Sequence, residues 1–158
     1  QELLEQTLHG SIQVLVDVLS LVNPEAFGRS RRLRSYMAQL VGAANLTPRW
    51  RFETAALLSQ LGCVTVPVEL LTKARSGATL SPTEHAVLAG HPACAKELLQ
   101  HIPRLEEIAQ AIAQSASAEP PSEPLAMALR LVTGFEAQVH GGVDRAGAVQ
   151  RLRTDHPG

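Results

Sequence analysis

The sequence predicts an all-α fold, and three observations lead to this prediction. Apolar residues recur at the three- and four-residue spacing of amphipathic helices along most of the 158 residues. Cap residues and prolines stand where such helices would begin, and glycines stand where they would end. The alternation typical of a strand occurs only in the segment CVTVP, Cys63 to Pro67, which has no partner strand and is expected to be an extended link.

The first part of the chain is expected to form three helices. The first covers the first twenty-odd residues and ends near Asn23-Pro24, because its apolar positions follow a helical period up to that point. A second amphipathic pattern runs from Phe27 to Val41. The third opens at Thr47-Pro48, a cap residue followed by a proline at the first helical position, and runs towards Gly62.

Six further helices are expected in the rest of the chain, and the segment Ser115–Pro124, rich in proline and serine, is expected to be a surface loop. The expected helices cover Val68–Lys73, a segment that begins at the capping box Ser81-Pro82-Thr83-Glu84, His91–His101, Leu105–Gln114, Leu125–His140 and Asp144–Arg153. The prediction is therefore one domain over residues 1–158, a bundle of about seven to nine helices without internal repeats.

Composition limits the classes of partner. The chain is 45% hydrophobic and 18% charged with a net charge of −1, so it can bury a core but has no global field that attracts nucleic acid or an anionic membrane. Aromatic residues make up only 3%, too few for base-stacking surfaces. Two cysteines and no signal-peptide pattern favour a cytoplasmic protein with reduced thiols and no membrane insertion. The helical pattern already present at Gln1 favours a fragment of a longer protein.

Motifs in the middle of the chain resemble those of a known family. The segment LLTKARSGATLSPTEHAVLAGHPACAKELLQHIPRLEEIAQAI, which includes Lys73, Glu84 and His91-Pro92, is similar to the middle of an HD-GYP domain. The segment PLAMALRLVTGFEA resembles the helix that follows the Gly-Tyr-Pro loop of that family. The resemblance extends over nearly the whole chain and implies an HD-domain-like orthogonal helical bundle.

The chain departs from this family where the family binds metal. In the HD-GYP family that the chain resembles, the active proteins hold two or three iron or manganese ions, which activate water to hydrolyse cyclic di-GMP. The His-His-Glu and Gly-Tyr-Pro segment is absent, and His91 is the one obvious ligand retained. The substituted positions are Arg29 for the first His, Ser59 and Gln60 for the His-Asp pair, Cys63 for the motif's Lys, and Thr133 for an Asp.

These substitutions predict that the metal site is lost. Neutral Ser59, Gln60 and Thr133 cannot offset the ~4 positive charges of two divalent ions or lower the pKa of bound water. Arg29 is a permanent cation and repels a metal ion. His85 and His101 have no partners at zinc-ligand spacing. We therefore expect no catalytic residue, no metal and no cofactor.

The sequence favours a catalytically inactive HD-GYP-like domain that serves as a regulatory or protein-interaction output module in a bacterial two-component signalling protein of the response-regulator type. Two alternatives stay open. One is a metal-dependent phosphohydrolase or cyclic di-GMP phosphodiesterase with an unconventional site. The other is a sensor that binds a nucleotide, such as a cyclic dinucleotide, through Arg29 and Lys73 without hydrolysing it.

The sequence alone leaves two interpretations open for several residues. Arg29 and its neighbours in RSRRLR form either a solvated helix face or, at Arg29, a cation in the vacated pocket. Trp50 is either a core residue or an exposed anchor for a partner. The N-terminal helix either packs wholly on its own domain or also forms a homodimer seam. Cys63 and Cys94 are expected to be small buried residues.

Overall fold

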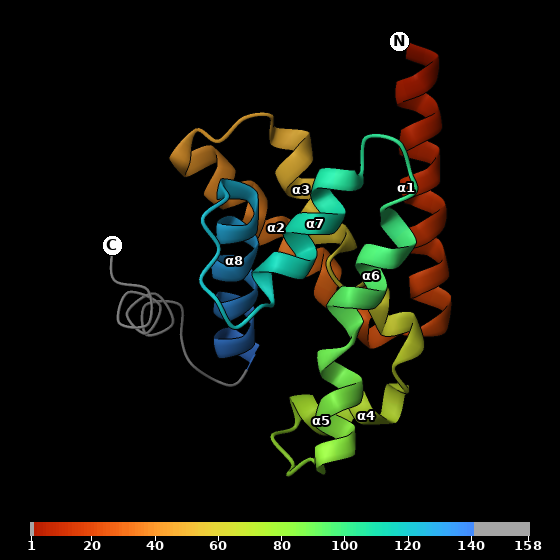
Figure 1. Cartoon of the computed structure of the whole chain (residues 1–158), viewed down its shortest axis with the longest axis vertical. Coiled ribbons are helices and arrows are strands. Elements are labelled where there is room, and N and C mark those ends of the chain that lie inside the picture. Colours follow the sequence, from red (N-terminus) through yellow and green to blue (C-terminus); the bar gives the residue numbers. More distant parts are fainter. Residues whose placement is uncertain (1, 141–158) are drawn as a thin grey trace.

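The computed structural model of the chain describes residues 2–140, and those residues are helical with no strand among them (Figure 1). The elements are α1 (Glu2–Val22), α2 (Pro24–Ala44), α3 (Arg49–Leu58), the 3-10 helix η1 (Leu61–Thr65), α4 (Val68–Arg75), α5 (Pro82–Ala89), α6 (His91–Leu99), α7 (Glu106–Ser115) and α8 (Pro124–His140). The predicted all-α bundle is confirmed. The helix expected at Asp144–Arg153 lies outside the described residues.

Capping chemistry fixes the starts of α2 and α5, and the sequence predicts the second of them. The side chain of Asn23 accepts a hydrogen bond from the backbone N–H of Ala26 at 3.3 Å, and Pro24 is the first residue of α2. At α5 the capping box is complete, because Ser81 Oγ accepts from the N–H of Glu84 at 3.2 Å and Glu84 Oε1 accepts from the N–H of Ser81 at 2.9 Å.

The prediction for residues 47–67 is wrong in two respects. The third helix starts after Pro48 without a side-chain cap and ends at Leu58, short of Gly62. Residues Leu61–Thr65 then form η1 rather than an extended link. Tertiary hydrogen bonds stabilise this conformation. The buried Asn23 donates from Nδ2 to the carbonyl oxygens of Cys63 and Val66, each at 3.3 Å. These bonds satisfy backbone groups that a strand partner would otherwise take.

The bundle is organised around α2, which packs against α1, α3 and α8, while α7 packs against α6 and α8. Its main core includes Leu33 and Met37 of α2 with Leu58, Leu99 and Leu129, all almost fully buried. A smaller apolar cluster surrounds η1 and consists of Leu19, Ala26, Cys63, Val66, Leu70 and Leu71. This arrangement brings the end of α3, η1 and the start of α6 next to α2.

Figure 1 shows α1 along one side of the bundle and the short helices α4 and α5 at the end away from α3. No residue of α5 is buried, and the ion pair between Lys73 and Glu84 links it to α4. Within residues 2–140, no single helix is long and apolar enough to cross a membrane. The segments Arg49–Thr65 and Val68–Arg75 reach that length and composition only as a pair, which is bent by 119°.

Candidate functional site

The buried carboxylate of Glu136 in α8 is the centre of a cluster of three arginines. Its side chain is 1% exposed. Arg29 Nε lies 2.9 Å from Oε2, and Arg32 donates to Oε1 from Nε at 3.2 Å and from Nη2 at 3.1 Å. Arg75 of α4 donates to the same Oε1 from Nη2. Three guanidinium groups from two helices therefore converge on one acid, and they tie the C-terminal part of α8 to α2 and α4.

Electrostatics keep Glu136 ionised. Burial alone raises the pKa of its carboxyl group, but the hydrogen bond from Arg75 and the charges of Arg29 and Arg75 act against burial, and the net result is a pKa below the ordinary value. A buried carboxylate is stable only when its charge is matched and its oxygens accept hydrogen bonds. Both oxygens of Glu136 do so, and an additional carboxylate, Glu25, lies 3.5 Å from Arg75.

Arg29 also holds the residues that stand at the His-Asp positions of the HD-GYP motif. Its Nη1 donates to Gln60 Oε1 at 3.2 Å, and Gln60 Nε2 donates to Ser59 Oγ at 3.3 Å. Ser59 Oγ in turn donates to the carbonyl of Ala56 at 2.8 Å. Ser59 and Gln60 are buried, so their polar groups are satisfied inside the protein. The structure thus brings Arg29, Ser59 and Gln60 together in one hydrogen-bonded network.

Cys63 and His91 lie beside this network. Cys63 Sγ is 3.8 Å from Gln60 Oε1, and burial raises the pKa of its thiol to about 11. Burial and, secondarily, the charge of Arg29 lower the pKa of His91 to about 4, so its imidazole is neutral near pH 7. His91 Nδ1 is buried and has no hydrogen-bond partner among the described residues. Cys63 is buried as expected, whereas Cys94 is only partly buried.

Thr133 and Lys73 make contacts outside this network. Thr133 Oγ1 donates to carbonyl oxygens one turn earlier in α8, those of Leu129 at 2.9 Å and Arg130 at 3.1 Å. Lys73 Nζ lies 2.9 Å and 3.1 Å from the two carboxylate oxygens of Glu84. Residues two apart on a helix point in nearly opposite directions. Arg75 therefore reaches the cluster, while Lys73 faces α5.

The residues at these positions do not fit a di-metal centre. By the resemblance, Arg29, Ser59 and Gln60 stand at ligand positions, and a guanidinium, a serine hydroxyl and an amide are not the imidazole and carboxylate ligands that such a centre needs. Within residues 2–140, no group of three or more His, Cys, Asp and Glu side chains could hold a metal ion. The acid that is present, Glu136, already binds three arginines.

Sequence reasoning did not single out Glu136, Arg32 or Arg75. A usable signal existed for Glu136, because it lies four residues after Val132 and seven after Leu129 and therefore on the buried face of α8. An acid on a buried face requires a cation. The interpretation of RSRRLR as a wholly solvated face is wrong for Arg29 and Arg32, whereas Arg31 lies over the ring of Phe27 at 5.9 Å.

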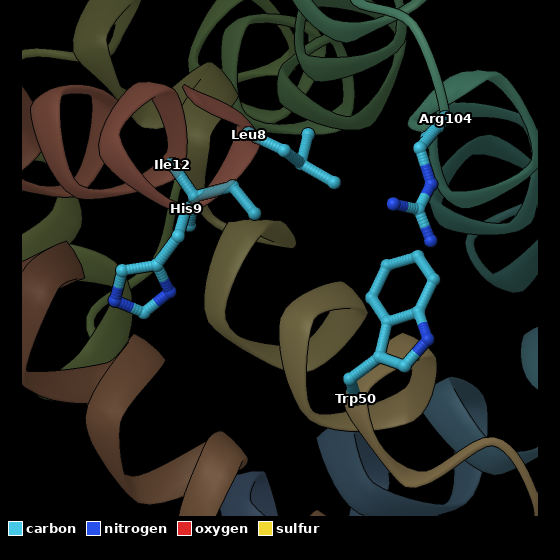
Figure 2. Close-up of a pocket in the computed structure, with 5 residues that line it drawn as sticks. All are labelled: Leu8, His9, Ile12, Trp50 and Arg104. Atoms are coloured by element: carbon cyan, nitrogen blue, oxygen red, sulfur yellow. The ribbon is translucent and has the colours of Figure 1, made fainter. Parts of the chain in front are cut away.

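A separate open pocket of about 270 Å³ lies between α1 and α3 (Figure 2). Leu8 and Ile12 line one side, and Trp50 with Arg104 above it lines the other. The guanidinium carbon of Arg104 is 5.2 Å from the centre of the indole ring, a cation–π distance. Trp50 is 39% exposed, so it is not a core residue. The pocket shares no residue with the Glu136 cluster.

The chain matches a known protein family. A family model described as an HD domain matches residues 13–118, about two thirds of the chain. The matched region includes Arg29, Ser59, Gln60 and His91 and ends before α8, which carries Glu136. Comparisons with curated proteins and with solved structures give no match.

Proposed function

The chain belongs to the HD domain family, a family of metal-dependent phosphohydrolase type, and within it we propose a non-catalytic, HD-GYP-like member. Its role is that of a regulatory or protein-interaction output domain in a bacterial signalling protein of the response-regulator type. By the same proposal, the domain acts in the cytoplasm on protein partners and is one part of a longer chain.

One observation carries the loss of catalysis. Arg29, which the resemblance aligns with the first His of the motif, donates hydrogen bonds to Glu136 and to Gln60, one of the two residues aligned with the His-Asp pair. A water molecule activated for hydrolysis requires either a metal ion or a free general base. Glu136 is ionised, but the three arginine cations around it oppose its protonation, so it is a poor general base. The pKa of His91 is lowered to about 4, so its imidazole is a weak base as well.

The direct test is turnover. The purified chain should show no hydrolysis of cyclic di-GMP, or of a generic phosphodiester such as bis-p-nitrophenyl phosphate, in the presence of added manganese or iron. The alternative of a phosphohydrolase with an unconventional site predicts turnover that His91→Ala abolishes. Turnover that survives purification to homogeneity and is lost in that variant would overturn the proposal.

A second candidate function is a sensor that binds an anionic nucleotide without hydrolysing it. The convergence of Arg29, Arg32 and Arg75 favours it, because the same groups that bind a carboxylate also bind a phosphate. In this case Glu136 is an internal competitor that a ligand phosphate must displace. Lys73, the other contact proposed from the motif, would first have to leave Glu84.

Calorimetric titration distinguishes the sensor from a module that binds only proteins. The probes are cyclic di-GMP and inorganic phosphate, each titrated into wild type, Glu136→Gln and Arg29→Ala. A sensor should bind cyclic di-GMP more tightly in Glu136→Gln, because the competing carboxylate is gone, and more weakly in Arg29→Ala. The absence of heat in wild type and in Glu136→Gln would eliminate the sensor and leave the protein-binding module.

A further inference from the structure

Helix α1 carries a second apolar stripe on the side that faces away from the core. The stripe consists of Val14, Val18 and Leu21, which are 61%, 43% and 84% exposed. A fully folded domain gains nothing from such residues on a solvated face, and contiguous exposed apolar residues are typical of an interaction surface. In Figure 1, α1 lies along one side of the bundle, so that its outer face is not covered by the other labelled helices.

The spacing of the stripe identifies the kind of partner. Thr7, Ser11, Val14, Val18 and Leu21 follow one another at intervals of four, three, four and three residues, which is the heptad pattern of a coiled-coil seam. With Ser11 and Val18 at the a positions, the others fall at d. The opposite f position is Val16, which is buried in the domain's own core. One face of α1 thus packs on the domain and the other has the register for a second helix.

We propose that this stripe pairs with the α1 helix of a second copy of the chain in a parallel, two-stranded coiled coil. A β-branched residue at a with leucine at d, here Val18 and Leu21, favours this oligomeric state. The residues beside the seam also allow this pairing. The acid nearest the seam is Asp17 at a g position, and in a parallel pair it faces Val22 of the other copy at e. No two like charges therefore meet there. Asp17 already accepts a hydrogen bond from Gln13 Nε2 at 2.9 Å.

The expected dimer is weak and depends on concentration, because the seam spans only about two heptads. Sedimentation or light scattering of the intact chain over a wide range of concentrations should show the mass rising towards twice that of the monomer. Leu21→Glu and Val14→Glu should weaken dimerisation roughly tenfold or more, since each places a charge in both halves of an apolar seam. Gln6→Glu adds the same charge to the exposed helix outside the seam and should dimerise like wild type.

Cross-linking tests the parallel orientation. In a Cys94→Ala background, Val14→Cys and Leu21→Cys should each form a disulfide-linked dimer with itself, because d residues face their own counterparts in a parallel pair. Gln6→Cys is the control and should not do so. Cross-links that form only when the Val14→Cys and Leu21→Cys variants are mixed, joining one variant to the other, would overturn the parallel arrangement.

A wild-type chain that stays monomeric at every concentration overturns the proposal. The stripe would then be covered by another occupant, such as residues 141–158 or a different protein. A dimer that is unchanged by Leu21→Glu and Val14→Glu also overturns it, because the interface would then lie elsewhere. Neither result bears on the loss of catalysis, which depends on the Glu136 cluster and is measured by turnover.

Discussion

Among the described residues, Glu136 is the charged residue that is almost fully buried, so its charge depends most on opposite charges around it. Its carboxylate is buried, and the three arginines around it would repel one another without it. The carboxylate that Arg29 binds is thus supplied by the chain itself. Resemblance placed Arg29, Ser59 and Gln60 at one site, but Glu136 is 107 residues from Arg29 in the sequence, and no local pattern joins them.

Replacement of Glu136 by glutamine should destabilise the protein strongly. Glu136→Gln removes the negative charge and leaves three guanidinium groups close together, so the free energy of unfolding should fall by about 3 kcal/mol. Urea unfolding measures this change. The matched control is Glu53→Gln, which removes an exposed ion pair with Arg49 and should cost less than about 1 kcal/mol. Equal, small losses for the two variants would contradict the assigned role of Glu136.

His91 should make stability depend on pH between about 6.5 and 4. Its pKa is about 4 in the folded protein and 6.5 without burial, so the unfolded chain takes up the proton first as the pH falls. The stability that depends on a neutral His91 is therefore complete above pH 6.5 and is lost as the pH approaches 4, about 3 kcal/mol in all. Carboxylates, Glu136 among them, add their own losses only below about pH 4.5.

Chemical unfolding at a series of pH values measures this dependence. His91→Gln should flatten the slope between pH 6.5 and 4, because it removes the group that takes up the proton. His85→Gln replaces an exposed histidine and serves as the control. If the slope of wild type persists in His91→Gln, the burial of His91 is not its cause.

At the scale of elements, the contact between η1 and α6 positions the network. Gly62 lies against the backbone of His91, and a Cβ at residue 62 would collide with the carbonyl oxygen of His91. A backbone atom cannot move aside as the end of a side chain can, so this close approach requires glycine. It also explains why His91, at the start of α6, lies beside Cys63 and Gln60.

Substitution of Gly62 by alanine should therefore separate η1 from α6. We expect Gly62→Ala to lower the free energy of unfolding by at least about 2 kcal/mol. Gly42→Ala is the control, because a Cβ there meets nothing within 4 Å and an alanine in α2 should stabilise the helix by roughly 0.5–1 kcal/mol. Thermal unfolding compares the two. A tolerated Gly62→Ala would mean that η1 and α6 are not in close contact.

Most helices could be predicted because their causes are local. Helical periodicity marks α1, α2 and α8, and a capping box marks α5. η1 was missed because its cause is not local. Its residues alternate like a strand, and besides its own backbone hydrogen bonds the segment is held by hydrogen bonds from Asn23 to Cys63 and Val66, 40 and 43 residues away.

Across the bundle, the Glu136 cluster links helices that are distant in the sequence. Arg29 and Arg32 come from α2, Arg75 from α4 and Glu136 from α8. In a metal enzyme, ligands from several helices fulfil the same structural role while also binding the reactive ion. Here the ion pairs between Glu136 and the three arginines keep the helices together.

Metal content is the measurement that tests this account most directly. The chain should be purified under anaerobic, chelator-free conditions and analysed by plasma mass spectrometry for iron, manganese and zinc. On the proposed alignment, Arg29, Ser59 and Gln60 stand where the metal ligands would be, so we predict well under one ion per chain, unchanged in His91→Ala. One or more ions per chain, lost in His91→Ala, would contradict the account and show that the chain retains a metal centre built from other ligands.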